Sequence, residues 1–385
     1  MPPVTQDMRC DVLIVGAGIT GALMAEQLTR RGHDVVVIDR APPGGGSTAA
    51  STAMLLWEID RPLRELTELY GFERAARAYR ASHDAVRGLQ GLVRQLGLSC
   101  QTRDKPSLYL AAGDSTSALR DEHELRCRAG LPGDFLDHRA LLETFEIARA
   151  GAILSAGSAD ADPVQLTHGL LDIAIRRGAR LLQADAADFD PASHAVGVRL
   201  ANGNTIEARH VVLATGYVMP DIVQARVQRT VSTWAIATTP QPDRLWRDGA
   251  LIWEDKDNYL YARTTVDGRI IVGGEDDDAV IDPQARDALT PQKIATLRQR
   301  LAALWPRAAR EIDFGWSGAF DVTDDGLPLI GPVPGATNIH AAYGYGGNGI
   351  TFSFLAAQLI GLSLAGGSSP LFEDFALDRP RVTKA

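Results

Sequence analysis

Apolar, small and polar residues follow one another over the first forty positions in the order of a strand, a turn, a helix and a second strand. An apolar run at 11–15 is followed by glycines at positions 16, 18 and 21 and by a helix-forming stretch at 22–31. A second apolar run at 34–38 ends in Asp39. Short apolar runs between turn residues are typical of buried strands in a parallel sheet. The pattern predicts a β-α-β unit with a glycine-rich first turn.

Each part of this unit suits the binding of a dinucleotide. Gly16 permits a sharp turn, Gly18 permits close approach of a pyrophosphate, and Gly21 permits close packing of the helix on the strand. The helix N-terminus directs its partial positive charge at the phosphates. Asp39 can accept hydrogen bonds from ribose hydroxyls, and an acid there favours NAD or FAD over NADP. A glycine-rich turn in another α/β protein is the alternative, and the complete order of elements disfavours it.

Helical and strand-forming patterns alternate along the rest of the chain. The stretches 196–200 and 205–208 flank an Asn-Gly turn and predict a hairpin. The buried run 210–216 is expected to rejoin the parallel sheet and to bring its small last residues to the cofactor. A block rich in aromatic and β-branched residues at 231–275 predicts antiparallel sheet. Helices are predicted at 63–96, 118–129, 139–144, 164–178, 291–304 and 350–365.

Composition and charge narrow the class of protein. The chain has 385 residues, enough for two hydrophobic cores. A net charge of −9 and the lack of basic runs argue against a nucleic-acid partner. Cys10, Cys100 and Cys127 are isolated, so we expect neither a redox disulfide nor a metal site, and the low cysteine count suits the cytoplasm. The apolar stretch at 350–365 is short for a membrane span and contains Gln358, which predicts a buried helix and no span.

Four features in order make the sequence resemble a known family. The first three are the glycine turn with Asp39, the small-residue loop Gly46-Ser-Thr-Ala-Ala-Ser51, and the strand end Leu213-Ala-Thr-Gly216. The fourth is a pair of late motifs, Thr323-Asp-Asp-Gly326-Leu-Pro-Leu-Ile-Gly331 and Gly344-Tyr-Gly-Gly347-Asn-Gly349. Together they resemble the D-amino-acid oxidase (DAO) family of FAD enzymes, which includes glycine oxidase, sarcosine oxidase and γ-glutamylputrescine oxidase.

This resemblance implies a fold, domain boundaries and a cofactor. The fold class is α/β, with a Rossmann-type, glutathione-reductase-like FAD-binding domain and a second, mainly antiparallel-sheet substrate domain. The FAD-binding domain is expected at 1–80, 150–220 and 321–385, and the substrate domain at 81–149 and 221–320. FAD is expected to be non-covalent, since no cysteine lies beyond position 127. The expected cofactor-binding residues are Gly16, Gly18, Ile19, Thr20, Gly21, Asp39, Arg40, Ser47, Thr48, Ala50, Ser51, Ala186, Ala214, Thr215, Gly216, Gly326, Gly346, Gly347, Asn348, Gly349, Ile350 and Thr351.

The late glycine turn has a physical role of its own. Its glycines permit close backbone approach, and a helix is expected to begin near Ile350. The partial positive charge of that helix N-terminus would favour the negative charge that develops at the flavin N1–C2=O edge on reduction. Thr351 can donate a hydrogen bond to the same edge. A glycine-rich helix cap with no ligand is the alternative.

In the family, the flavin ring lies between the cofactor domain and the substrate sheet. Strand alternation places Tyr259, Tyr261 and Arg263 on one face of that sheet. Tyr261 can hydrogen-bond a substrate group, and Arg263 can bind a carboxylate through two nitrogens. A structural role is the alternative, because aromatic residues in sheets usually belong to the core. The resemblance thus gives four catalytic candidates, which are Tyr261, Arg263, Trp234 and Asn348.

Some positions depart from the family pattern or leave a choice open. Glycine oxidase has an arginine that clamps the substrate carboxylate, and Phe320 stands at the corresponding position. Sarcosine oxidase has a lysine that assists the reaction with oxygen, and Ile271 stands there. Glu58 and Asp60 follow the small-residue loop, where one acid can meet a cationic amine or can instead pair with Arg61 or cap a helix.

The resemblance implies an FAD-dependent oxidoreductase that oxidises a C–N bond of an amine or amino acid. A hydride would pass from the substrate C–H bond to flavin N5, and the imine would hydrolyse. The alternatives are an FAD dehydrogenase of a hydroxy acid or polyol, and a flavin-binding subunit of a heteromeric complex. The expected partners are a small-molecule substrate and oxygen or another electron acceptor, the expected compartment is the cytoplasm, and an oligomer is possible.

Overall fold

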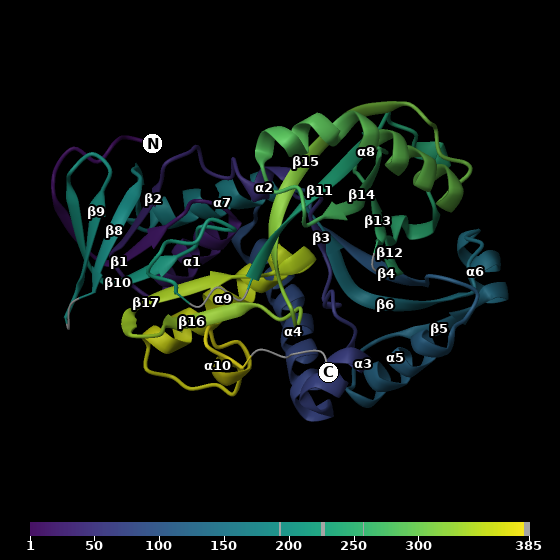
Figure 1. Cartoon of the computed structure of the whole chain (residues 1–385), viewed down its shortest axis with the longest axis horizontal. Helices are drawn as coiled ribbons and strands as arrows, with labels where there is room; N and C mark the ends of the chain where they lie inside the picture. Colours follow the sequence, from purple (N-terminus) through teal and green to yellow (C-terminus); the bar gives the residue numbers. More distant parts are fainter. Residues whose placement is uncertain (192–193, 225–227, 257, 381–385) are drawn as a thin grey trace.

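Two β-sheets form the centres of the two halves of the molecule, and helices pack around them (Figure 1). The computed structural model describes residues 1–191, 194–224, 228–256 and 258–380. The first sheet has the strand order β16-β17-β10-β1-β2-β7, continued from β10 by β9 and β8. The second has the order β15-β11-β14-β13-β12-β4-β6-β3, with β5 on β6. The predicted α/β fold with two sheets is confirmed.

The first sheet is parallel at its centre because its central strands are apolar and buried on both faces. β1 (Met8–Val15) pairs in parallel with β2 (Val35–Asp39) and with β10 (Thr205–Leu213). The carboxyl ends of these three strands therefore meet at one edge of the sheet, where α/β proteins bind their ligands. The other strands of this sheet are β7 (Arg180–Gln183), β8 (Ala186–Pro191), β9 (Val196–Leu200), β16 (Leu329–Val333) and β17 (Ala336–Tyr343).

Strand β10 unites two elements that the sequence predicts separately. Its first half pairs with β9 and forms the predicted hairpin. From Ile206 to Leu213 the strand also pairs in parallel with β1, and its last residues pair with β17. The sequence does not predict β8, because its six residues are small, acidic or proline apart from Phe189, and most of them are exposed.

The second sheet contains the predicted antiparallel block. Its longest pair joins β11 (Gln228–Thr238) to β15 (Ile312–Thr323). One expected domain boundary, at residue 150, precedes a strand that belongs to this sheet, since β6 (Gly151–Asp160) pairs with β4 (Arg103–Ala111). The remaining strands are β3 (Met54–Leu55), β5 (Asp134–Asp137), β12 (Leu251–Asp255), β13 (Leu260–Thr264) and β14 (Ile270–Asp277).

Two predicted helices have different bounds in the structure. The stretch 63–96 forms two helices, α3 (Leu63–Tyr70) and α4 (Phe72–Leu96), because Gly71 adopts φ +77° between them. α4 continues through the expected domain boundary at residue 80. α8 (Pro283–Leu304) begins before the predicted residue 291, since the Asp282 side chain accepts a hydrogen bond from Ala285 N at 2.8 Å and caps the helix.

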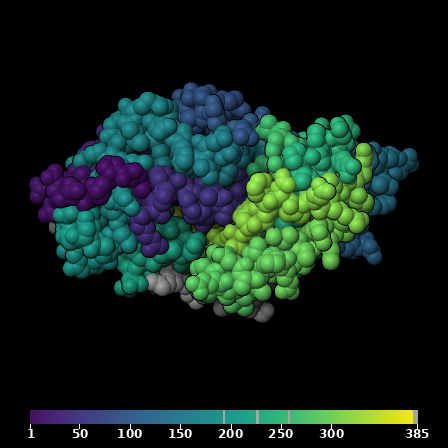
Figure 2. All heavy atoms as spheres, turned by 90° about the horizontal axis from the view of Figure 1, so that it is seen from above, coloured from purple at the N-terminus to yellow at the C-terminus, as the bar shows by residue number. Residues whose placement is uncertain are grey.

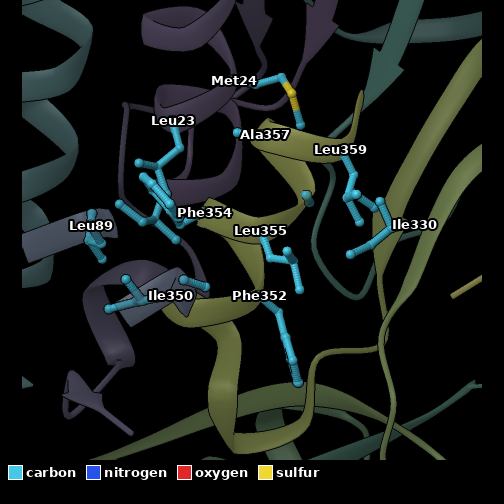
Figure 3. Packing of buried hydrophobic residues seen from close by; sticks show 14 of the residues in the cluster. Leu23, Met24, Leu89, Ile330, Ile350, Phe352, Phe354, Leu355, Ala357 and Leu359 are labelled. Atoms are coloured by element: carbon cyan, nitrogen blue, oxygen red, sulfur yellow. The ribbon is translucent and has the colours of Figure 1, made fainter. Parts of the chain in front are cut away.

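Helix α9 (Gly349–Leu364) is the central helix of the largest hydrophobic core. It packs against α1 (Ile19–Arg30) and α4, with Leu23 and Met24 above it, Leu89 to its left, and Ile330 of β16 to its right beside Leu359 (Figure 3). The stretch Gly346–Leu364 is long and apolar enough to cross a membrane, but 67% of its most apolar window is buried inside the protein. Most of this helix is therefore packed inside the protein, in line with the prediction of a buried helix.

The remaining elements are short connectors or cover the sheets. They are α2 (Ser47–Ala50), α5 (Ser117–Arg128), α6 (His138–Phe145), α7 (Pro163–Arg176), α10 (Leu371–Asp374), η1 (Pro242–Arg244), η2 (Arg247–Gly249) and η3 (Gly346–Asn348).

Candidate active site

A cavity of about 700 Å³ lies where the two sheets meet. Its walls come from the carboxyl ends of β1, β2 and β10, from the segment after Asp39, from β11, β12, β13 and β15, and from the start of α9. Figure 2 shows the segment after Asp39 lying between the two halves of the molecule. The cavity is large enough for an extended dinucleotide and a small second ligand, and both sheets contribute to it.

The glycine turn has the geometry that a dinucleotide requires. Gly16 adopts φ +113°, and a side chain there would overlap the carbonyl oxygen of Ala214. A side chain at Gly21 would overlap the carbonyl oxygen of Gly16, and one at Gly18 would lie 3.2 Å from Thr48 Oγ1. Only glycine fits at Gly16 and Gly21, because the turn packs on the end of β10 and α1 packs on the turn.

Asp39 is oriented by the backbone at the end of β2. Its Oδ2 accepts a hydrogen bond from Ala17 N at 2.7 Å, and its Oδ1 accepts one from Ala41 N at 2.8 Å. Arg40 and Ala186 line the same part of the cavity. The carboxylate is thus held at the glycine turn, at the position where an acid binds ribose hydroxyls in dinucleotide folds.

The small-residue loop joins the two sheets. Thr48 Oγ1 accepts a hydrogen bond from Ile19 N at 3.0 Å, which attaches the loop to the N-terminus of α1. On the other side, Ser47 Oγ donates to Ala319 O at 3.0 Å, and Trp316 Nε1 donates to Ala50 O at 2.9 Å. Ser47, Thr48, Ala50 and Ser51 all line the cavity, so this loop forms a floor between the sheets.

The N-termini of α1 and α9 open onto the same cavity. Ile19, Thr20, Ile350 and Ser353 line it, and Thr20 Oγ1 lies 2.7 Å from Ser353 Oγ. The structure therefore brings together the early and late motifs that the sequence predicts to meet. Ala214, Thr215 and Gly216, at the end of β10, also line the cavity, as do Gly346, Gly347, Asn348 and Gly349.

Side chains at the start of α9 hold the segment that follows β3. Asn348 Nδ2 donates hydrogen bonds to Leu56 O at 3.1 Å and to Glu58 O at 2.8 Å. Thr351 Oγ1 donates to Leu56 O at 2.9 Å. Thr351, for which a hydrogen bond to the flavin is predicted, is buried and does not line the cavity, and its hydroxyl donates to the protein backbone instead.

Gly326 also lies away from the cavity, although the resemblance gives it a cofactor role. It adopts φ +71°, and a side chain there would approach Arg61 Cβ within 2.8 Å. Gly326 therefore serves the turn between β15 and β16.

Aromatic side chains of the second sheet form one wall. Tyr259, Tyr261 and Trp253 line the cavity, and Trp253 stacks on Tyr109 with ring centroids 3.8 Å apart. The Tyr261 ring lies across Gly273 of β14, where a side chain would overlap the phenol. Burial raises the pKa of both tyrosines, so they stay neutral and can act as hydrogen-bond donors. The sequence does not single out Trp253, whose apolar neighbours resemble any core strand.

Trp234 and Arg263, two of the catalytic candidates, lie outside the cavity. Trp234 is fully buried in the core of the second sheet and donates to Arg286 O at 3.3 Å. Arg263 does point to the same face as Tyr261, but its guanidinium is covered by Thr52, whose carbonyl oxygen accepts from its Nε. Arg263 Nη1 also lies 3.4 Å from Asp160 Oδ2. Arg263 is thus an internal ion-pair partner and not a free carboxylate clamp.

Acidic side chains also line the cavity. Glu58 is buried and held by Ser107 and by Arg126, whose Nη1 lies 3.7 Å away. Asp60 also lines the cavity and accepts a hydrogen bond from Gly347 N at 2.6 Å. Burial, opposed by that hydrogen bond and assisted by the charge of Asp276, raises the pKa of Asp60 to about 6. Phe320 lines the wall where the resemblance places an arginine, and Asp321 follows it.

The comparisons with known proteins agree with this geometry. The family described as DAO, FAD dependent oxidoreductase, matches residues 11–361. The chain is 27% identical over 387 residues to a gamma-glutamylputrescine oxidoreductase of Escherichia coli, covering 97% of this chain and 87% of that protein. It is 26% identical over 365 residues to a glycine oxidase of Bacillus licheniformis, covering 91% and 92%. A glycine oxidase structure from Geobacillus kaustophilus superposes with a TM-score of 0.80 at 23% identity, covering 97% and 99%.

The class of protein is thus an FAD-dependent oxidoreductase with a nucleotide cradle and an aromatic second sheet. The chain belongs to the DAO family, and FAD is its cofactor. The side-chain overlaps at Gly16 and Gly21 and the orientation of Asp39 fit that cofactor. Its three cysteines are free, and none of them lines the cavity.

Proposed function

We propose that the enzyme oxidises a C–N bond of an amine or amino acid in this cavity, in the cytoplasm, with oxygen or another compound as electron acceptor. The relatives named gamma-glutamylputrescine oxidoreductase and glycine oxidase support this reaction class. The observation that carries the proposal is one cavity in which the nucleotide cradle of the first sheet meets the aromatic wall of the second.

When bound, FAD supplies the acceptor for the hydride that leaves the substrate carbon. The residues of the chain bind and orient both molecules. The N-terminus of α1 and Asp39 hold the nucleotide, and Tyr259, Tyr261 and Trp253 confine the substrate. Because the cavity is lined mainly by apolar and aromatic groups, it excludes water from the reacting C–H bond. The same exclusion of water strengthens the attraction between the Asp60 carboxylate and a cationic amine. The imine product needs only water for its hydrolysis.

The test is anaerobic reduction of the purified FAD-bound enzyme. Addition of a primary amine or amino acid from a broad panel should bleach the flavin absorbance, and air should restore it if oxygen is the acceptor. The Gly16→Ala variant should bind FAD weakly and serves as the control for a specific site, since its side chain overlaps Ala214. Protein that holds FAD but is not bleached by any amine or amino acid would refute the proposal.

A further inference from the structure

The late glycine turn holds the Asp60 carboxylate at the start of α9. Asp60 Oδ2 accepts a hydrogen bond from Gly347 N at 2.6 Å. A side chain at Gly346 would overlap the same oxygen, and one at Gly347 would lie 2.9 Å from Asp60 Oδ1, so the two glycines leave room for the carboxylate. Asp60 lines the cavity and is exposed to it. The turn therefore orients a carboxylate that a ligand in the cavity can reach.

Asp60 also acts electrostatically on the aromatic wall. Burial raises the pKa of Tyr259, and the negative charges of Asp276 and Asp60 raise it further. Burial and the same two charges also raise the pKa of Tyr261. Both tyrosines line the cavity. Asp60 is thus close to the part of the cavity in which the second sheet would confine a substrate.

The other acidic side chains of the lining are engaged or lie elsewhere. Glu58 accepts a hydrogen bond from Ser107, and Arg126 Nη1 lies 3.7 Å from it. Asp321 Oδ1 accepts from Thr230 Oγ1 at 2.8 Å, and Asp321 Oδ2 is sealed from the cavity. The remaining ones belong to the first sheet or to the loops after its strands, and they are Asp39, Asp185, Asp188 and Asp221. Among the described residues, Asp60 is the one carboxylate near the second sheet that is open to the cavity and has no basic partner.

Few other groups of the lining can exchange a proton near neutral pH. The described residues of the lining include no histidine, lysine or cysteine, and Arg40 stays protonated. Removal from bulk water raises the pKa of Asp60 to about 6, against the hydrogen bond from Gly347 and with the help of the charge of Asp276. A carboxylate with a pKa close to the working pH is an effective proton acceptor.

The oxidation of an amine requires a proton acceptor before the hydride leaves. A primary amine resembles the lysine side chain, whose pKa is about 10, so it enters the cavity as an ammonium ion at neutral pH. The ammonium nitrogen has no lone pair with which to form the C=N bond. One N–H bond must therefore break first, and its proton must pass to a group in the cavity.

We propose that Asp60 is the general base of the reaction, which binds the substrate ammonium group and takes one proton from it. An N–H bond of the substrate breaks and an O–H bond forms on the Asp60 carboxylate. The hydride then leaves the substrate carbon with its electron pair, and the nitrogen lone pair closes the C=N bond of a protonated imine. This inference rests on the proposed function, in which FAD takes up the hydride, and it gives that reaction a catalytic residue.

The experiment follows the anaerobic bleaching of the FAD-bound enzyme at saturating amine between about pH 5 and pH 10. The probes are n-butylamine, butane-1,4-diamine and glycine, together with the fastest substrate of the broader panel. Asp60→Asn keeps an oxygen that can accept from Gly347 N but cannot take a proton. Its limiting rate constant of bleaching at neutral pH should be lower than that of the wild type by about one hundredfold or more. That rate constant should rise about tenfold per pH unit towards the pKa of the free amine, because the deprotonated amine no longer needs a base.

The groups around Asp60 determine the pH profile expected of the wild type. Asp276 of β14 is the charged group that raises its pKa, and Gly347 N of η3 is the donor that lowers it. Arg61, the next residue in the chain, is turned towards Glu65 Oε2, which lies 3.0 Å from its Nη1. The wild-type rate constant should therefore fall only as the pH drops through about 6, where Asp60 becomes protonated.

A second variant tests the assignment with Asp60 left in place. Asp276→Asn removes a charge from a residue that does not line the cavity, so the acidic limb of the profile should move to lower pH without the loss of rate seen for Asp60→Asn. The matched control is Asp278→Asn, whose exposed carboxylate pairs with Arg229 at 2.7 Å and whose loss should leave the profile unchanged. Flavin absorbance and thermal melting verify that each variant is loaded and folded.

The outcomes separate this inference from the proposed function. An Asp60→Asn enzyme with the wild-type limiting rate constant and only a raised dissociation constant for the amine would make Asp60 a binding group and overturn the inference. A loss of rate that does not depend on pH, or an acidic limb that stays in place in Asp276→Asn, would overturn it as well. Absence of bleaching of the wild type by any amine or amino acid would refute the proposed function itself.

Discussion

At the residue scale, Arg263 is a candidate ligand for a substrate carboxylate that pairs instead with a buried carboxylate of the protein. Asp160 is 1% exposed and pairs with both Arg103 and Arg263, which come from two different strands. Burial lowers the pKa of Arg263, and the charge of Asp160 opposes that shift and keeps the guanidinium protonated. The three residues form a charged cluster beneath the loop at Thr52.

Replacing Arg263 should therefore affect stability more than substrate binding. The Arg263→Met variant leaves Asp160 with Arg103 alone, and removal of one partner from a buried pair costs about 3 kcal/mol. Urea unfolding should show this loss, while KM for the best substrate changes by less than about threefold. Arg139→Met, which breaks an exposed pair with Glu143, is the control. A large rise in KM without loss of stability would instead make Arg263 a substrate ligand.

At this scale, the sequence could place site residues whose positions are determined within a single local unit of structure. Gly16, Gly21 and Asp39 act within one β-α-β unit, so their spacing is sufficient to place them. Trp234 and Thr351 could not be placed in this way. Whether each side chain faces the cavity or the core depends on which face of its strand or helix is covered by another part of the chain. The periodicity of a single element does not reveal that.

At the element scale, the late turn between β15 and β16 is fastened to the C-terminal segment by a buried ion pair. Arg379 Nε lies 2.7 Å from Asp325 Oδ2, Arg379 Nη2 lies 2.8 Å from Asp325 Oδ1, and Tyr70 donates to Asp325 at 2.6 Å. Burial alone would raise the pKa of Asp325, but the hydrogen bonds and charge of Arg379 outweigh it and lower that pKa to about 2.

Because this pKa is lower in the folded than in the unfolded protein, the pair stabilises the fold above about pH 4. Its contribution, roughly 2 kcal/mol, should disappear as the pH falls towards 2. The free energy of unfolding of Asp325→Asn should thus lie well below that of the wild type at pH 6, and the two should converge at low pH. Urea titrations at several pH values measure this, with Tyr70→Phe as a milder control. A difference that does not depend on pH would contradict the assignment.

Elements were predictable where a turn motif marks a hairpin or where apolar residues set the period. The hairpin β9–β10 and the buried helix α9 follow from such patterns. The break at Gly71, the early start of α8 and the exposed strand β8 do not. They depend on one backbone conformation, on the cap by Asp282 and on pairing with β9.

At the scale of the whole molecule, the cofactor cavity is shared by two cores that contact through a few segments. The loop at 47–51 bonds to α1 on one side and to β15 on the other. A ligand that fills this space contacts both halves and should couple their stability, although its phosphates bind at the first sheet.

Tryptophan fluorescence can test this coupling, because Trp246 and Trp305 lie in the core of the second sheet. FAD at about one hundred times its dissociation constant should stabilise the folded protein by about 2.7 kcal/mol. If the halves unfold together, the tryptophan signal and the helix signal in circular dichroism should shift equally on addition of FAD. The Gly16→Ala variant should show neither shift, because its side chain overlaps Ala214 in the phosphate cradle. A tryptophan transition that stays in place while the helix signal moves would mean that the second sheet unfolds independently of the cofactor.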